Sequence, residues 1–326
     1  MLAASELVWE RFEKPYGAVN EWVEIAREHL GKPASSLVNG ALRRLCREAE
    51  AAPIPPEDLL PTALTEAWKG SGRPVGGLVM ALSHPYRAFW HEFTREPAQG
   101  LPGEPWDWEG GRCLRLEPGC SPQRVLAERA ASGFFQNIAA ARIAHAVFRR
   151  LEGRPILDLC AAPGGKSLQI ARLAALEGQP LEVTASDANP RRFKLLESSP
   201  LVSRLPGLRV ASPAAIKDQR FPCVLLDVPC GNSGVLAKSP EAVRHAWKAG
   251  DTFREVQESL LAEGAARLTG PGGLLFYGTC SLFPVENGDR ARAFALERHF
   301  EIEHEEQHWP DAEGQHGAYL AILRAR

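Results

Sequence analysis

The chain has 326 residues, of which 44% are hydrophobic and 24% charged, and its formal net charge is −2 at pH 7. The composition excludes a disordered or fibrous protein, and the length favours one catalytic domain with a smaller companion domain. The slightly negative charge argues against binding nucleic acid through bulk positive charge, although it does not exclude a local basic groove.

We find neither a membrane-spanning run nor a secretion signal in the sequence. No apolar run is long enough to cross a bilayer, and Met1–Glu13 is acidic and helix-patterned, unlike a signal peptide. The seven cysteines are odd in number and irregularly spaced, which argues against a secreted disulfide framework. We therefore expect a cytoplasmic protein whose cysteines are free thiols.

The first part of the chain is predicted to be helical. Apolar residues recur at helical spacing from Ser5 to about Glu50, and a third helical segment is predicted near Leu78–Phe93. The proline-rich stretch Ala52–Pro56 and the glycine-rich stretch Gly70–Gly77 interrupt these helices. Pro97–Gly119 is rich in Gly, Pro and Trp without periodicity, and we interpret it as a connection between domains.

Beyond Gly133 the pattern changes to alternating strands and helices, which indicates parallel βαβ units and a doubly wound α/β domain. We predict helices over Ile138–Leu151, Lys166–Leu176 and Thr252–Leu268, and strands over Ile156–Leu159, Leu181–Ser186, Cys223–Asp227, Gly273–Tyr277 and Ala318–Leu323. The expected domains are a helical domain over 1–96, a connecting segment over 97–132 and a catalytic domain over 133–326.

The segment Ile156–Ser167 contains a strand, a tight glycine turn and the start of a helix. Its adjacent glycines allow close approach of a ligand, and the helix N-terminus offers free N–H groups, which suits a nucleoside-type cofactor. At the end of the next strand, Asp187 stands where a carboxylate would accept both ribose hydroxyls. A purely structural turn is the alternative. A phosphate-binding P-loop is disfavoured, because Cys160 occupies the place of its first glycine.

Two further strand ends carry thiols, in Asp227-Val-Pro-Cys230 and in Tyr277-Gly-Thr-Cys280-Ser281. Residues beyond the carboxyl ends of parallel strands converge, so both cysteines and Asp227 should face the cofactor. Methylation of cytosine at carbon 5 requires a thiolate to add at carbon 6, an acid to stabilise N3, and a base to remove the carbon-5 proton. A single cysteine at a strand end is more often an inert buried residue, but the two motifs together favour this chemistry.

These motifs resemble those of the Sun/RsmB family of RNA cytosine-C5 methyltransferases. The resemblance covers most of the chain and extends to Gly133–Gln136, to Pro284-Val-Glu286-Asn287 and to Gly317–Ala321. It implies that Cys280 is the nucleophile, that Cys230 helps to release the product, and that Lys166 positions Asp227. It also implies a Rossmann-like fold that binds S-adenosylmethionine through Cys160, Ala161, Ala162, Pro163, Gly164, Gly165, Lys166, Asp187, Arg192, Ser212 and Asp227.

The N-terminal segment Lys32–Arg44 is similar to the NusB-like domain that precedes the catalytic domain in this family. Within it and just beyond, Arg43, Arg44 and Arg47 are candidates for phosphate contacts or, equally, for a solvated helix face. The expected partner is RNA, with ribosomal RNA favoured, in a single-stranded or looped context because the target base must leave its stack. We expect a monomer with no metal and no membrane association.

Three departures from the family pattern define further expectations. Gly231 stands where a serine usually follows Cys230, and Ser212, or a backbone carbonyl, would have to replace the aspartate that holds the adenine amino group. The region between Pro97 and Gly133, where an RNA-binding subdomain normally sits, is short. The missing aspartate and the short region between Pro97 and Gly133 support an alternative function, a catalytically weak RNA-binding or ribosome-assembly factor that retains the methyltransferase fold.

Two other functions are weighed and disfavoured. A DNA methyltransferase would attack from the cysteine of a Pro-Cys motif, but it would leave the Thr-Cys-Ser motif without a role. His304-Glu-Glu-Gln-His308 matches the string of zinc proteases, which requires both histidines on one helix. Here the preceding residues alternate as in a strand and Trp309-Pro310 follows at once, so we expect no zinc site.

Overall fold

The computed structural model describes residues 15–51, 60–83, 87–95, 100–117, 120, 122–129, 132–239, 242 and 251–326. The chain divides into two compact units, residues 1–65 and 66–326. The predicted helical start at residues 5–14 and the break at residues 52–56 lie outside the described residues. Among the helices of the described ranges, none combines the length and apolarity needed to span a membrane.

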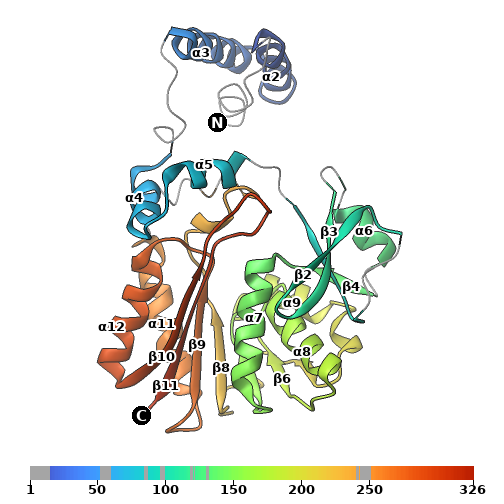
Figure 1. Cartoon of the computed structure of the whole chain (residues 1–326), viewed down its shortest axis with the longest axis vertical. Helices are drawn as coiled ribbons and strands as arrows, with labels where there is room; N and C mark the ends of the chain where they lie inside the picture. Colours follow the sequence, from blue (N-terminus) through green and yellow to red (C-terminus); the bar gives the residue numbers. More distant parts are fainter. Residues whose placement is uncertain are drawn as a thin grey trace. The chain divides into compact units, whose positions relative to one another are not determined.

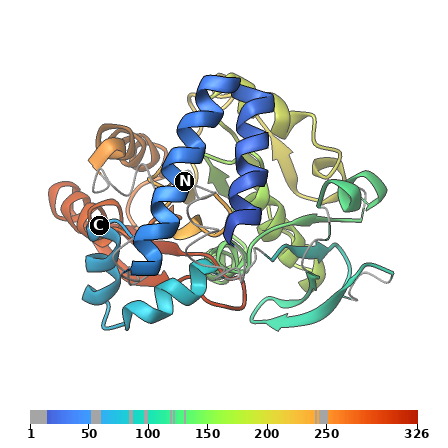
Figure 2. The ribbon, with the colours of Figure 1, turned by 90° about the horizontal axis from the view of Figure 1, so that it is seen from above.

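The first unit contains a helical hairpin of α2 (Pro15–Leu30) and α3 (Lys32–Ala51), seen as two dark blue helices in Figure 2. Gly31 joins them with a φ of 85°, a left-handed conformation that favours glycine. Val19 of α2 packs with Leu42 and Cys46 of α3. The hairpin agrees with the predicted helical, NusB-like N-terminal region, and α3 carries Arg43, Arg44 and Arg47.

Two short helices, α4 (Thr62–Gly70) and α5 (Val75–Ser83), follow, so the predicted break at Gly70–Gly77 is confirmed over residues 71–74, while Gly76 and Gly77 lie in α5. The helix predicted over Leu78–Phe93 is wrong in its second half, because α5 ends at Ser83 and Phe89–Glu92 forms strand β1. Pro85 lies between them in the sequence, and proline cannot continue a helix. Phe89 and Trp90 are buried in this strand, and aromatic residues are favoured in strands.

The segment predicted to connect the domains contains two regular strands that the sequence did not indicate. Strands β2 (Gly103–Trp108) and β3 (Gly111–Leu116) form a hairpin that joins β1 and β4 (Gly133–Phe135) in an antiparallel sheet of order β2-β3-β1-β4. Helix α6 (Pro122–Arg129) lies between β3 and β4 in the chain. Figure 1 shows this small sheet beside α7 and α8. The segment Pro97–Gly119, interpreted from its sequence as a connection between domains, thus contains two paired strands.

The large sheet has seven strands in the order β10-β11-β9-β8-β5-β6-β7. They are β5 (Ile156–Asp158), β6 (Val183–Ala185), β7 (Leu208–Val210), β8 (Cys223–Asp227), β9 (Leu274–Thr279), β10 (Phe300–His308) and β11 (Ala318–Ala325). Strands β5 to β9 pair in parallel, and β11 pairs antiparallel with both β9 and β10. The predicted doubly wound α/β domain is confirmed.

Helices cover both faces of this sheet (Figure 1). They are α7 (Ile138–Leu151), α8 (Gly165–Glu177) and α9 (Pro190–Glu197) on one face, and α11 (Arg254–Ala266) and α12 (Gly288–Arg298) on the other. Successive residues of a strand serve opposite cores: Leu225 of β8 packs with α7 and α8, whereas Leu226 packs with α11 and α12. Burial on both faces explains the continuous apolar runs that predicted these strands.

Candidate active site

Because β5, β6, β8 and β9 are parallel, the loops that follow them meet at one edge of the sheet. The loop after β5 ends at Gly164, whose φ of 115° is left-handed, and a Cβ there would lie 3.0 Å from Leu196 Cδ1. Helix α8 begins at the next residue, Gly165. The N–H groups of its first turn therefore lie beside this loop and have no partner within the helix. Glycine is thus required at the position where the sequence predicted a cofactor turn.

A buried aspartate, which the sequence analysis did not single out, fixes the same loop. Asp158 accepts hydrogen bonds from Ser167 Oγ at 2.6 Å and from the Cys160 backbone N–H at 3.2 Å. Burial raises the pKa of Asp158 to about 7. The only signal in the sequence was a carboxylate as the last residue of an apolar strand.

Lys166, in the first turn of α8, reaches Asp227 at the end of β8. Its Nζ lies 2.6 Å from Asp227 Oδ2, and the two side chains are 14% and 34% exposed. Burial lowers the pKa of Lys166, but the charge and hydrogen bond of Asp227 outweigh this effect and raise the pKa above its usual value. The lysine is therefore a permanent positive charge, and the predicted contact between Lys166 and Asp227 is present.

The two predicted cysteines also come together. Cys230 Sγ and Cys280 Sγ are 3.2 Å apart, a hydrogen-bond contact and not a disulfide. Cys230 is buried, whereas Cys280 is partly exposed. The hydrogen bond to Cys280, followed by burial, raises the pKa of Cys230 well above that of an ordinary thiol. Of the two thiols, Cys280 is the one that an incoming molecule can reach.

Asn232 is a further polar group beside these thiols that the sequence analysis missed. Its Oδ1 accepts hydrogen bonds from Cys280 Sγ at 2.8 Å and from Cys230 Sγ at 3.6 Å. Its φ of 56° is left-handed, which asparagine tolerates better than most residues. The amide therefore restrains both sulfur atoms from one side.

Glu286 and Asn287 hold the two cysteine loops from behind. The Gly231 N–H donates to Glu286 Oε1 at 2.9 Å, and burial raises the pKa of this glutamate. Asn287 accepts from Thr279 Oγ1 at 2.5 Å and donates to the Ser281 carbonyl at 2.9 Å. The Pro-Val-Glu-Asn segment is thus a support for the turns that carry both thiols.

Two of the predicted cofactor ligands, Asp187 and Ser212, already have hydrogen-bond partners within the protein. The Asp187 side chain is fully buried, and its carboxylate accepts from the N–H groups of Ala162 and Asn189 at 3.3 and 2.8 Å. Arg192 Nη2 also pairs with it at 3.1 Å. Ser212 follows β7, and its Oγ accepts from the Ala215 N–H at 3.3 Å within its own turn. The structure thus brings Asp187 and Arg192 to the loop after β5, while the Ser212 hydroxyl is engaged locally.

The side chain of Gln136 indicates whether the loop after β5 suits a polar cofactor. Both polar atoms of its side-chain amide are buried without a hydrogen-bond partner, and a Cβ on Gly165 would lie 3.4 Å from its Nε2. Unpaired buried amides are rare in proteins because they are costly. An orphaned amide beside the N-terminus of α8 therefore fits a polar ligand in the loop after β5.

The histidine string lies elsewhere. His304 and His308 are on strand β10, as the alternating pattern predicted, and not on a helix. Glu306 lies between them, 3.5 Å from His304 Nε2 and 3.8 Å from His308 Nε2.

Comparison with known proteins agrees with this architecture. The family model described as 16S rRNA methyltransferase RsmB/F matches residues 146–321. Ribosomal RNA small subunit methyltransferase B of Thermus thermophilus is 32% identical, over 93% of this chain and 70% of that protein. The probable ribosomal RNA small subunit methyltransferase B of Bacillus subtilis is 28% identical, over 86% of this chain and 67% of that protein.

The crystal structure of the protein PH0851 shares the fold, with a TM-score of 0.69 and 22% identity over 99% of this chain and 80% of that chain. The family model covers more than half of the present chain, and the Thermus relative is matched over more than two thirds of its own length. The chain therefore belongs to the RsmB/F family of 16S rRNA methyltransferases.

Proposed function

We propose that this RNA methyltransferase methylates carbon 5 of a cytosine in small-subunit ribosomal RNA, through a transient bond between Cys280 and carbon 6. The observation that carries the proposal is the 3.2 Å contact between the two thiols. It lies at the same sheet edge as the Lys166–Asp227 pair. The names of the Thermus and Bacillus relatives support ribosomal RNA as the substrate. S-adenosylmethionine, when bound, would supply an electrophilic methyl group.

Cys280 is proposed as the nucleophile because it is the more accessible thiol. Its thiolate adds to carbon 6, and the electron pair of the 5,6 double bond then becomes available at carbon 5 for bonding to the methyl group. Cys230 stays protonated at this stage because its pKa is raised, so that its S–H can donate to the Cys280 thiolate. The buried thiol thus stabilises the charge of the attacking one.

The release step is assigned to Cys230. Its hydrogen bond to Cys280 is the largest cause of its raised pKa, and this cause weakens once the Cys280 sulfur is bonded to carbon. Cys230 can then lose its proton to water, and its thiolate takes the proton from carbon 5; the electron pair of that C–H bond re-forms the double bond and expels the Cys280 thiolate. Asp227, held by Lys166, is assigned to accept a hydrogen bond from N3, which takes up the proton that the Cys280 thiol loses as the adduct forms.

The cofactor is proposed to lie on the loop after β5. Its ligands would be Cys160, Ala161, Ala162, Pro163, Gly164 and Gly165, with Lys166, Asp187, Arg192, Ser212 and Asp227. For Asp187 to accept ribose hydroxyls, Arg192 has to move from the position in which it pairs with this carboxylate. The orphaned amide of Gln136 is a further donor and acceptor for a ligand at this place.

The remaining parts of the proposal concern substrate and organisation. The target base would have to leave its stack to reach Cys280, which favours a single-stranded or looped RNA. We propose a monomer that acts in the cytoplasm, where ribosomal RNA is found. The parts 1–96, 97–132 and 133–326 remain our proposal for the functional division, and the small sheet crosses both boundaries, with β1 in the first part, β2 and β3 in the second and β4 in the third.

The proposal is tested by identifying the modified nucleoside. Small-subunit RNA from a strain that lacks the protein is incubated with the protein and S-adenosylmethionine, digested, and analysed by mass spectrometry. The expected product is 5-methylcytidine, and it should be missing with the Cys280→Ala variant. A methyl group on another nucleoside, or on the ribose, would contradict the cytosine chemistry.

The pairing of Asp187 with Arg192 favours a second candidate function, that of an RNA-binding or ribosome-assembly factor that methylates poorly. Asp187 is buried beneath Arg192, and Ser212 is engaged within its own turn. Calorimetric titration with S-adenosylmethionine separates the two functions. Failure to bind at millimolar concentration would favour the factor, and binding would favour the enzyme.

A further inference from the structure

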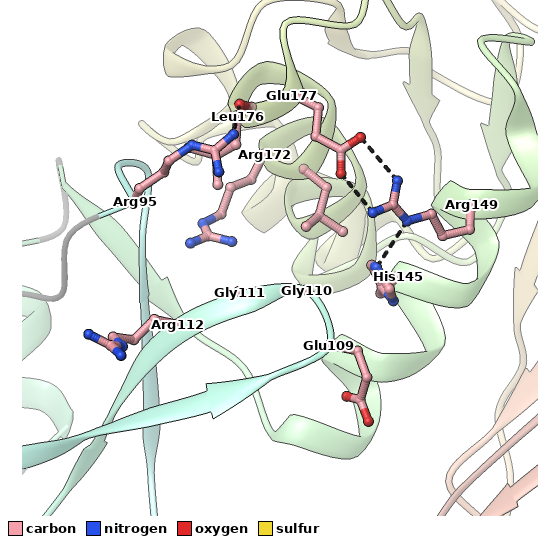
Figure 3. A pocket seen from close by; sticks show the side chains of 11 residues that line it. Arg95, Glu109, Gly110, Gly111, Arg112, His145, Arg149, Arg172, Leu176 and Glu177 are labelled. Carbon is pink, nitrogen blue, oxygen red and sulfur yellow. Dashed lines mark hydrogen bonds and ion pairs between the residues drawn. The ribbon is translucent and has the colours of Figure 1, made fainter.

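A cavity of about 320 Å³ lies between the β2–β3 turn and the C-terminal halves of α7 and α8 (Figure 3). It is separate from the proposed active site. Lys166 is in the first turn of α8, whereas Arg172, which lines the cavity, is roughly 9 Å further along the same helix. The volume lies at the lower end of the range of ligand sites, about 300–1,000 Å³, and so is large enough for a phosphate group.

The lining of the cavity is strongly basic. Its lining includes four arginines and two glutamates, namely Arg95, Arg112, Arg149, Arg172, Glu109 and Glu177. Two of these six have partners just outside the cavity, since Arg142 pairs with Glu109 at 2.9 Å and Asp107 pairs with Arg112 at 2.6 Å. Because Arg142 is positive and Asp107 is negative, these two partners cancel, and the cavity keeps its excess of positive charge. The site therefore attracts an anion, although the whole chain is slightly negative.

Arg172 gives the most direct indication of a ligand. It is only 1% exposed, and in Figure 3 its guanidinium extends from α8 toward the turn at Gly110 and Gly111. Its Nε donates to the Glu92 carbonyl, but its Nη1 has no partner, and it forms no ion pair with a carboxylate of the described residues. Burial lowers the pKa of Arg172 to about 10. A buried cation without a direct counter-ion is costly, and a bound anion would offset this cost.

The rim of the cavity completes the site. Arg95 and Arg112 are exposed, and Arg95 is oriented by its hydrogen bond to the Leu176 carbonyl at 2.7 Å. Arg149 is fixed on the other side by Glu177, with two contacts of 3.1 Å. The planar fork of a guanidinium matches two oxygens of a phosphate group. An exposed rim around a buried arginine lets one unit of a polymer enter while the rest of the chain stays outside.

We propose that this cavity binds a backbone phosphate group of the substrate RNA, outside the place where the target base reacts. The proposal rests on the proposed function only in taking RNA as the substrate. It adds a positioning contact on the side of α8 that faces the small β-sheet, and it assigns a role to the β2–β3 hairpin, which forms one wall of the cavity.

The test measures binding of a labelled single-stranded RNA of mixed sequence by fluorescence anisotropy over a range of salt concentrations, without a methyl donor. Each phosphate contact that is lost lowers the slope of log K against log salt by about 0.7 for single strands. Arg172→Gln and Arg112→Gln should each lower the slope by about this amount, and Arg172→Lys should retain most of it. Arg298→Gln is the matched control, since Arg298 lies on α12, across the large sheet.

Melting temperatures confirm that each variant is folded, and Arg112→Gln, at an exposed position, carries the test if Arg172→Gln unfolds. Unchanged slopes in the folded cavity variants would overturn the proposal. Inorganic phosphate, compared with chloride at equal ionic strength, supplies the second arm. If it raises the melting temperature of the wild type but not of Arg172→Gln while the RNA slopes stay equal, the cavity takes a free phosphate and the RNA assignment is wrong. Failure of the wild type to bind any RNA would instead count against the proposed function.

Discussion

At the scale of single residues, the candidate site depends on which polar groups share a buried edge of the sheet. The convergence of Cys230, Cys280 and Asp227 was predictable, because each follows a parallel strand and such strands end at one edge. Asn232 was not predictable, since its place beside both sulfur atoms depends on a left-handed backbone. The burial of Asp187 beneath Arg192 also depends on side-chain packing that no pattern in the sequence reports.

The pH dependence of stability provides a test of Asp158. Its pKa is raised to about 7 by burial, whereas the pKa of an unfolded aspartate is about 4. Between these values the folded chain keeps a proton that the unfolded chain has lost, so stability falls as the pH rises, by at most about 1.4 kcal/mol per unit. Asp158→Asn should therefore gain stability relative to the wild type from pH 4 to pH 7, as measured by urea unfolding. The same gain in the exposed control Asp218→Asn would argue against a specific role of Asp158.

At the scale of elements, the sequence predicted most of the large sheet but not the small one. Helix α7 and strand β8 have the predicted bounds, because their apolar patterns are long and uninterrupted. The hairpin β2–β3 was missed because its Gly, Pro and Trp residues mask the alternation, and because its pairing with β1 spans more than 20 residues of chain. Non-local pairing of this kind leaves no local signal in the sequence.

The backbone at Gly234 packs closely against Cys280 and Gly317, and this close packing can be tested by substitution. A Cβ on Gly234, in the short helix η3 (Ser233–Val235), would lie 2.6 Å from the Cys280 carbonyl oxygen and 2.7 Å from Gly317 Cα. Gly234→Ala must push these backbones apart, at a cost of about 1–3 kcal/mol in the free energy of unfolding, and should reduce methylation. Gly76→Ala, in α5, is the control, because a Cβ there meets nothing within 4 Å. Equal effects of both substitutions on stability and activity would contradict this account.

At the scale of the whole molecule, cofactor binding should stabilise the fold, because only the folded chain forms the loop after β5. A ligand at 100 times its Kd adds about 2.7 kcal/mol to stability and raises the melting temperature. S-adenosylmethionine should stabilise the wild type and Cys280→Ala alike, since Cys280 is assigned to the RNA. The shift should shrink with Asp187→Ala, in a thermal melt followed by circular dichroism. An unchanged shift in Asp187→Ala would remove this carboxylate from the cofactor site.

The most direct test of the central claim is covalent trapping of RNA by cysteine variants. Wild type, Cys230→Ala and Cys280→Ala are incubated with S-adenosylmethionine and RNA from a strain that lacks the protein, and are then run on denaturing gels. Cys230→Ala should retain RNA as a stable adduct because release is blocked, and Cys280→Ala should give neither adduct nor methylation. A trapped adduct in Cys280→Ala, or no labelling of RNA by a wild type that binds the cofactor, would contradict the assignment of Cys280 as the nucleophile.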